Sequence, residues 1–211
     1  MSPEKLTQEA NTKIKTWLND KDKLVVAIDG YTGVGKTTLS DNLVVINPEI
    51  VAVHYDDFLI STRELNEKLR VAGTNQREEV PHHNFDEIKR LVESFKNIEK
   101  IYQTKIFNPD TGEVDRLMSY DFVGKKILLI DGVFMFHPGR LNNLWDKRIY
   151  LDGNTAKIDE RRIKRQKERW GDKYFPETHP DSHFRQLVIA LKKYRQEYQP
   201  EKIADLVLND Q

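Results

Sequence analysis

The stretch Gly30-Tyr31-Thr32-Gly33-Val34-Gly35-Lys36-Thr37 decides the fold, because it fits the pattern G-x-x-x-x-G-K-[ST] at every fixed position. Its glycines let backbone N–H groups point at phosphate oxygens, and the helix that follows adds its positive end. Lys36 can reach the outer phosphates, and the Thr37 hydroxyl can coordinate Mg²⁺. A coincidental glycine-rich turn is disfavoured, because a strand pattern precedes the loop and a helical pattern follows it. We therefore expect ATP here, bound by Gly30, Thr32, Gly33, Val34, Gly35, Lys36, Thr37 and Thr38.

Outward from this loop, short apolar runs rich in β-branched residues alternate with helical patterns. The expected strands cover residues 24–28, 50–54, 102–107, 126–130, 148–151 and 204–208. The expected helices cover residues 3–18, 37–43, 61–70, 85–95, 154–170 and 181–198. Residues 108–112 read as a tight turn closing a hairpin insertion, and residues 73–81 as an exposed loop. Core strands that alternate with helices predict an α/β fold with a mainly parallel sheet.

The composition sets limits on partners and compartment. The 211 residues suit one domain, and Lys plus Arg equals Asp plus Glu at 34 each. This balance predicts neither a nucleic-acid surface nor a membrane surface. The absence of Cys excludes disulfides and thiolate metal sites and fits a reducing compartment. With no long apolar run and a polar first segment, we expect a soluble, cytoplasmic protein, and a homo-oligomer stays open.

Acidic residues follow several of the expected strands. Asp131 closes the apolar run 127–130, and Asp56 and Asp57 follow the strand at 50–54. The carboxyl ends of parallel strands share one edge with the phosphate loop, so Asp131 with Thr37 is expected to hold Mg²⁺ directly or through water. One of Asp56 and Asp57 is expected to orient an acceptor hydroxyl and take its proton. The alternative is that these acids merely end strands or cap turns in solvent.

Several pieces, in this order, resemble the superfamily of uridine kinase, nicotinamide riboside kinase and phosphoribulokinase. They are the phosphate loop, Asp56-Asp57-Phe58, His83-Asn84-Phe85-Asp86, Ile130-Asp131-Gly132-Val133 and the segment from Arg161 to Gly171. Together they cover most of residues 24–208. The resemblance implies a P-loop NTPase three-layer sandwich, with an N-terminal helix in residues 1–22, a lid at about residues 154–175 and a small hairpin insertion.

The resemblance also assigns residues on the acceptor side. It implies Asp56 as the catalytic base, with Asp57, His83, Phe85 and Phe107 against the acceptor. The chain departs from the family pattern at two places. Asp131 stands where Glu is usual, and the hairpin has Phe107-Asn108 where P-x-Y-D is typical. Aromatic stacking is retained there but the carboxylate is lost, so the acceptor stays open.

The segment between Asp159 and Arg169 is rich in arginine. Arg161, Arg165 and Arg169 are spaced i, i+4, i+8 and share one helical face. The resemblance implies a lid over the transferring phosphoryl group, where Arg165 and Arg169 would offset developing charge and Arg161 would bind nucleotide. The alternative is a solvated helix whose charges pair locally.

The function expected from these features is an ATP- and Mg²⁺-dependent phosphotransferase acting on a hydroxyl of a small metabolite, a nucleoside or ribosyl compound. A pantothenate kinase-like enzyme is the alternative within enzymes. The alternative from another class is a nucleotide-dependent switch or assembly protein without a small acceptor. Such switches usually carry a water-positioning Gln or Thr, for which the sequence has no clear counterpart.

Overall fold

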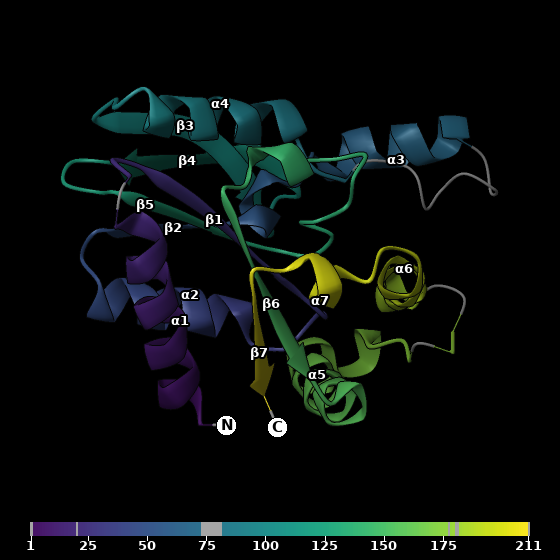
Figure 1. Cartoon of the computed structure of the whole chain (residues 1–211). Helices are drawn as coiled ribbons and strands as arrows, with labels where there is room; N and C mark the ends of the chain where they lie inside the picture. The colour runs from purple at the N-terminus through teal and green to yellow at the C-terminus, as the bar shows by residue number, and fades with distance from the viewer. Residues whose placement is uncertain (1, 20, 73–81, 177, 180–181, 211) are drawn as a thin grey trace.

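The computed structural model describes residues 2–19, 21–72, 82–176, 178–179 and 182–210. Its centre is a five-stranded sheet in the order β2-β5-β1-β6-β7 (Figure 1). Every neighbouring pair in this sheet is parallel. The strands are β1 (Leu24–Gly30), β2 (Ile50–His54), β5 (Ile127–Asp131), β6 (Lys147–Gly153) and β7 (Leu206–Asp210). This confirms the predicted α/β class.

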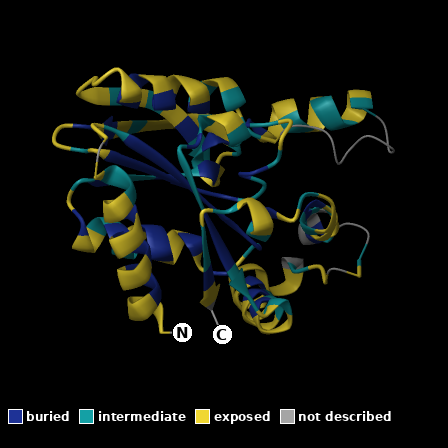
Figure 2. Cartoon of the chain, in the orientation of Figure 1, coloured by how far each residue is buried: buried dark blue, intermediate teal, exposed yellow. Residues whose placement is uncertain are grey.

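The two faces of the sheet carry separate cores, because side chains alternate between faces along each strand. Leu24, Val26 and Ile28 of β1 face α1 (Pro3–Leu18) and α2 (Lys36–Ile46). Val25 and Ala27 face α4 (Phe85–Lys96) on the other side. All seven residues of β1 are buried, as a strand covered on both faces requires (Figure 2). The result is the three-layer arrangement predicted from the sequence.

A separate antiparallel pair, β3 (Ile101–Asn108) and β4 (Glu113–Asp121), forms the predicted hairpin. It lies beside α4 at the top of Figure 1. The backbone N–H of Thr62, which begins α3 (Thr62–Ala72), donates to the carbonyl of Gly112 in the hairpin turn at 2.8 Å. The loop predicted at residues 73–81 lies outside the described residues.

The last part of the chain differs from the prediction in one place. The helices α5 (Thr155–Trp170) and α6 (His183–Tyr198) are found close to their predicted ranges. The last strand, predicted at residues 204–208, instead begins at Leu206, after the short helix α7 (Pro200–Ile203). The Asp205 carboxylate accepts hydrogen bonds from the Arg148 N–H at 2.9 Å and from Lys147 Nζ at 2.7 Å. These bonds, with the Asp205 N–H donating to the Arg148 carbonyl at 2.9 Å, fix the chain against β6 just before β7 begins.

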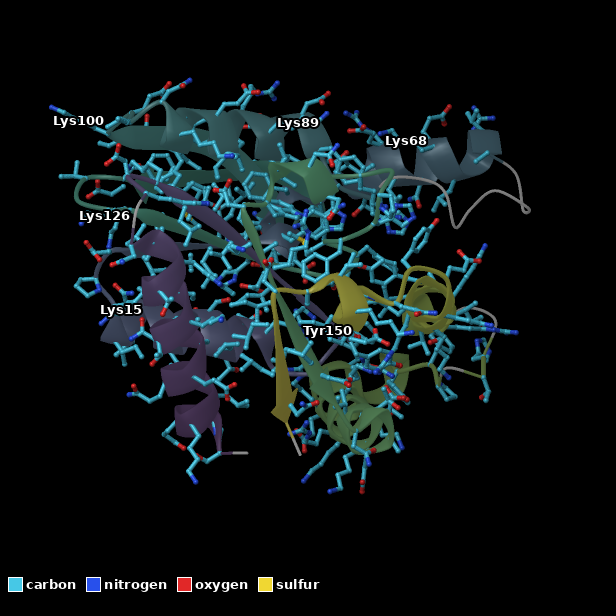
Figure 3. All side chains as sticks on the ribbon, viewed as in Figure 1. Lys15, Lys68, Lys89, Lys100, Lys126 and Tyr150 are labelled. Atoms are coloured by element: carbon cyan, nitrogen blue, oxygen red, sulfur yellow. The ribbon has the colours of Figure 1, made fainter. Side chains whose placement is uncertain are left out.

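The exposed charges are spread around the molecule. Lys15, Lys68, Lys89, Lys100 and Lys126 project from separate parts of the surface, whereas Tyr150 lies in the interior (Figure 3). Among the described residues, no helix combines the length and the apolar character that crossing a bilayer requires.

Candidate active site

The phosphate loop lies between β1 and α2, and two of its glycines are required by geometry. A Cβ at Gly30 would come within 2.4 Å of the carbonyl oxygen of Leu151 on β6, so no side chain fits there. Gly33 has φ of +80°, a left-handed conformation that residues with a side chain seldom adopt. These positions bring the loop tightly over the sheet edge and leave its N–H groups available as a phosphate nest.

Lys36, the first residue of α2, is buried although it carries a charge. Its Nζ donates hydrogen bonds to the carbonyls of Gly30 and Tyr31, both at 3.0 Å. Burial lowers the pKa of Lys36, and the negative charges of Asp29, Asp131 and Asp56 oppose that shift. The ammonium group is therefore held against the loop carbonyls in the electrostatic field of three carboxylates, as expected of a cation that meets phosphates.

A buried network lies directly beneath the loop. Asp29 accepts hydrogen bonds from the Tyr194 hydroxyl at 2.6 Å, the Gly30 N–H at 2.7 Å and the Phe136 N–H at 3.3 Å. Burial raises the pKa of Asp29, while these donors and Lys36 pull it down. The network joins α6, the segment after β5 and the start of the loop, so it fixes the loop from below.

Asp131 at the end of β5 lies beside the start of α2. The Thr37 hydroxyl donates to Asp131 Oδ1 at 3.1 Å, and His54 Nδ1 lies 2.8 Å from Asp131 Oδ2. The hydrogen bond to Asp131 raises the pKa of His54, and the nearby charges of Asp131, Asp41 and Asp57 act in the same direction. His54 thus fixes the orientation of this carboxylate.

Thr37 and Asp131 have the chemistry that Mg²⁺ requires. Both offer hard oxygen donors, and they already lie within hydrogen-bond distance of each other. Among the described residues, no three His, Cys, Asp or Glu side chains form a metal cluster. Mg²⁺ usually takes one or two protein ligands and completes its shell with phosphates and water, so the residues present fit this ion.

Asp56 lies in the short helix η1 (Tyr55–Phe58), immediately after β2. Its side chain is 84% exposed, so a substrate can reach the carboxylate. Oδ1 lies 3.9 Å from His83 Nε2, too far for a direct hydrogen bond but near enough for electrostatic attraction. Polar interaction with His83 is the main cause that lowers the pKa of Asp56, with Lys36 contributing. Asp56 is therefore ionised at neutral pH.

His83 is buried against η1 and stacks on the Tyr55 ring, with 3.7 Å between ring centroids. Burial lowers the pKa of His83 below its ordinary value, although Asp56 acts in the opposite direction. Burial outweighs the carboxylate in its effect on the pKa of His83, because the Asp56 carboxylate is open to water, which screens its charge. The imidazole is then neutral at neutral pH, and it faces the Asp56 carboxylate across 3.9 Å without a direct hydrogen bond.

Asp57 points toward the hairpin. Its Oδ1 lies 3.4 Å from Arg116 Nη2 on β4. Burial raises the pKa of Asp57, and the charges of His54 and Arg116 oppose that rise. The two adjacent acids thus have different surroundings, because Asp56 is open to solvent whereas Asp57 is tied to the hairpin.

The two predicted aromatic contacts occupy different places. Phe85, the first residue of α4, packs against the core on the α4 face of the sheet. Phe107 is half-buried on β3, next to the point where the pairing with β4 shifts register. The strand β3 lies against η1, so Phe107 belongs to an element that contacts the acid pair. Of the two rings, Phe107 is the better candidate for an acceptor contact.

The helix α5, predicted to form a lid, contacts the phosphate loop through a residue that the sequence reasoning did not select. Arg162 is 2% exposed, and its side chain would lie 3.6 Å from a Cβ placed on Gly33. Arg162 pairs with Asp159 at 2.9 Å, and the Tyr31 hydroxyl of the loop donates to the same Asp159 at 3.4 Å. The predicted lid residues Arg161, Arg165 and Arg169 are all exposed, although Arg161 and Arg165 line a cavity beside the loop.

A sequence signal for Arg162 did exist. Ile158, Arg162 and Gln166 are the buried residues of α5, and they share one face at i, i+4, i+8. Ile158 is the apolar residue that identifies the inward face. His54 and Tyr194 gave no comparable signal, because their roles depend on contacts across 77 and 165 residues of sequence.

A parallel sheet with a phosphate nest after β1, a carboxylate beside the loop threonine and an arginine helix above it define the class: this is a P-loop nucleotide-binding protein. The model of the phosphoribulokinase / uridine kinase family matches residues 25–175, and the chain belongs to that family of kinases.

Comparisons with individual proteins agree with this. The chain is similar to uridine-cytidine kinase C of Dictyostelium discoideum, 27% identical over 145 residues; the match covers 63% of this chain but 27% of that longer protein. A possible uridine kinase from Bacillus stearothermophilus has the same fold at a TM-score of 0.70, 16% identity and coverage of 99% and 100%. D-glycerate 3-kinase from Cryptococcus neoformans var. grubii has the same fold, with a TM-score of 0.68 and 12% sequence identity. That match covers 96% of this chain and 95% of the kinase chain.

Proposed function

We propose that this chain transfers the γ-phosphoryl group of ATP to a hydroxyl of a small nucleoside or ribosyl metabolite. The observation that carries the proposal is the exposed, ionised Asp56 beside the phosphate loop. His54 at the end of β2 pairs with Asp131 at the end of β5, and Asp131 accepts a hydrogen bond from the Thr37 hydroxyl, so η1 begins at the sheet edge that carries the phosphate loop. A hydroxyl at Asp56 and a phosphate at Lys36 would then be neighbours. A switch protein needs no such accessible carboxylate beside the phosphate loop.

Asp56 would accept the hydrogen bond of the acceptor hydroxyl and orient its oxygen toward the phosphoryl group. Phosphoryl transfer passes through a loose transition state, so the proton leaves late and positioning matters more than basicity. The lowered pKa of Asp56 suits this role, because an ionised carboxylate is available over the neutral pH range. His83 would hold the carboxylate in place through its buried imidazole.

Thr37 and Asp131 would hold Mg²⁺, which offsets negative charge on the nucleotide phosphates when it is bound. Lys36 would contact the outer phosphates, and Arg162 and Arg165 would meet them from α5. Activity is expected to disappear in excess EDTA and to return with added Mg²⁺ or Mn²⁺. Full activity in EDTA would exclude the proposed metal role.

The acceptor class is inferred from the hairpin side. Phe107 offers an aromatic face, and Arg116 reaches the acid pair from β4. Relatives named as uridine kinases support a nucleoside or ribosyl acceptor. The D-glycerate 3-kinase with the same fold makes a small hydroxy acid the main competitor, since Arg116 could pair with a carboxylate.

A coupled assay for ADP release tests the proposal directly. Nucleosides, nicotinamide riboside, pantothenate, glycerate and sugar alcohols are offered one at a time with ATP and Mg²⁺. Turnover with a nucleoside or riboside supports the proposal. Turnover only with pantothenate or glycerate would show that the acceptor is not a nucleoside or riboside. ATP turnover that needs a protein partner but no small acceptor would favour a nucleotide-dependent switch protein.

A further inference from the structure

A cavity of about 350 Å³ lies beside the phosphate loop and is lined by residues of α1, α2 and α5. One part of its wall is the loop itself, at Gly33 and Gly35, together with Thr38 in the first turn of α2. Arg161, Arg162 and Arg165 of α5 line it as well. Neither acid of η1, nor His83, nor any hairpin residue lines this cavity, so it is separate from the acceptor side.

The cavity extends from the phosphate loop along α2. Leu39 and Asn42 line it, and Asn42 follows Thr38 by one helical turn, about 5–6 Å farther from the loop. A triphosphate bound in the nest places its outer phosphates at Lys36 and its remaining part beyond the start of α2. The part of the cavity at Asn42 is thus where the nucleoside end of the nucleotide would lie.

The far wall comes from the first helix of the chain. Pro3, Leu6 and Thr7 in the first turns of α1 line the cavity. Leu6 and Thr7 are buried at 6% and 3% exposure, and the Thr7 hydroxyl donates to the Pro3 carbonyl at 2.8 Å. The only polar side-chain group of the three residues, the Thr7 hydroxyl, thus bonds within the helix, and the surface that Pro3, Leu6 and Thr7 present to the cavity is mainly apolar.

This wall is firmly held. The helix α1 packs against both α2 and β7. A buried hydrogen bond joins Asn47 Nδ2, directly after α2, to Asn11 Oδ1 on α1 at 2.9 Å. The helix lies outside residues 25–175, the part of the chain that the family model matches. The family model therefore does not describe this wall.

We infer that the first turns of α1 form a base-binding wall, with Leu6 packing against the purine of the bound nucleoside triphosphate. The inference rests on the proposed function, since it concerns the same nucleotide. The chemistry is suitable: a purine has apolar faces that Leu6 and Leu39 can cover and a polar edge within reach of Asn42. On the opposite wall, the guanidinium groups of Arg161 and Arg165 can stack on a planar base or pair with phosphate.

The test separates the base from the phosphates by using two ligands, ATP and inorganic tripolyphosphate. Leu6→Ala is expected to raise the Kd of ATP about five- to tenfold and to change the Kd of tripolyphosphate less than about twofold, because only ATP carries the apolar base. Leu18→Ala is the matched control, since Leu18 packs on the core from the other end of α1 and does not line the cavity. It is expected to leave both Kd values unchanged.

Hydrogen exchange on the wild-type protein gives a readout that needs no variant. ATP is expected to slow exchange in peptides that cover residues 3–10 more than tripolyphosphate does. Equal protection by both ligands, no protection by either, or equal weakening of both ligands by Leu6→Ala would overturn the base-binding wall alone. If the wild-type protein binds neither ligand, the proposed function fails together with this inference.

Discussion

The phosphate side and the acceptor side of the site are built in different ways. The phosphate side is one continuous loop, whose buried anchors Asp29 and Lys36 bond to backbone groups at 2.7–3.3 Å. On the acceptor side, backbone bonds such as Asn84 N–H to the Phe58 carbonyl at 2.8 Å hold the segments together, but the candidate side chains are farther apart, at 3.9 Å for His83–Asp56 and 3.4 Å for Arg116–Asp57. Catalytic contacts are often long before substrate binds, so the acceptor side is expected to tighten around its ligand, whereas the phosphate side is preformed.

The largest expected effect is on the phosphate side. Lys36→Ala removes the cation held over the loop, and kcat/KM is expected to fall by about three orders of magnitude or more. The fold is expected to persist, since the change also removes a charge whose burial is unfavourable. Steady-state kinetics and circular dichroism check both parts. Lys100→Ala, an exposed lysine remote from the site in Figure 3, is the control; near-normal turnover in Lys36→Ala would exclude the phosphate-loop role.

On the acceptor side, Asp56→Asn keeps the shape and removes the charge and the basicity. Acceptor phosphorylation is expected to fall about 10²- to 10⁴-fold, the usual cost of losing a general base. The Kd of ATP, measured by calorimetry, is expected to change little, because Asp56 is not part of the phosphate nest. An equal loss of ATP affinity and of turnover in Asp56→Asn would show that Asp56 also contributes to nucleotide binding, and would contradict the division into a phosphate side and an acceptor side.

Asp57→Asn is the matched comparison on the adjacent acid. Because Asp57 is tied to Arg116 on the hairpin, its loss is expected mainly to raise the KM of the acceptor. The reverse order, with the larger kcat loss in Asp57→Asn, would show that Asp57 is the base.

The helix α5, predicted to form a lid, lies against the phosphate side, and its arginines are expected to differ in effect. Arg162 lies against the loop, Arg165 lines the cavity, and Arg169 is exposed and away from the cavity lining. Alanine at each position is expected to lower kcat in that order, by about 10²-fold for Arg162, the usual cost of losing one donor to the transition state. Arg162→Lys keeps the positive charge, so its kcat shows how much of the loss in Arg162→Ala is due to charge. The melting temperatures of the variants show how much is due to lost packing. A larger loss for Arg169 than for Arg162 would contradict this order and support the exposed stripe.

The same contrast explains what could be predicted from sequence. The phosphate loop binds through backbone N–H groups, and the glycine spacing that this geometry requires is visible in the sequence from Gly30 to Thr37. The alternation of apolar strands with helices likewise predicts the α/β class. Arg162 was passed over because equal spacing describes several faces of a helix, and only the apolar Ile158 distinguishes the inward one. The roles of His54 and Tyr194 depend on contacts far apart in sequence, which no local pattern reports. The assigned roles of Asp56, Asp57, His83 and Phe107 stay predictions.

The smallest expected effect concerns the support beneath the phosphate loop. Tyr194→Phe removes the 2.6 Å hydrogen bond to Asp29 and leaves a buried carboxylate with one donor fewer. The free energy of unfolding is expected to fall by about 1–3 kcal/mol. The KM of the acceptor is expected to stay the same, because the contacts described for Tyr194 are with Asp29, with the segment after β5 and with Tyr198, and not with the acid pair.

The pH dependence of that loss follows from the sign of the Asp29 shift. Burial already raises the pKa of Asp29 above its ordinary 3.8, and losing the Tyr194 donor raises it further. A carboxyl group with a raised folded pKa binds more protons when folded, so its unfavourable contribution appears as pH rises from the unfolded pKa through the folded one. The stability difference between Tyr194→Phe and wild type is therefore expected to be larger at pH 8 than at pH 5, by denaturant titration. A difference that is constant with pH would mean that Tyr194 acts through packing alone, and the loop would then be held by its glycines and Lys36 without this carboxylate.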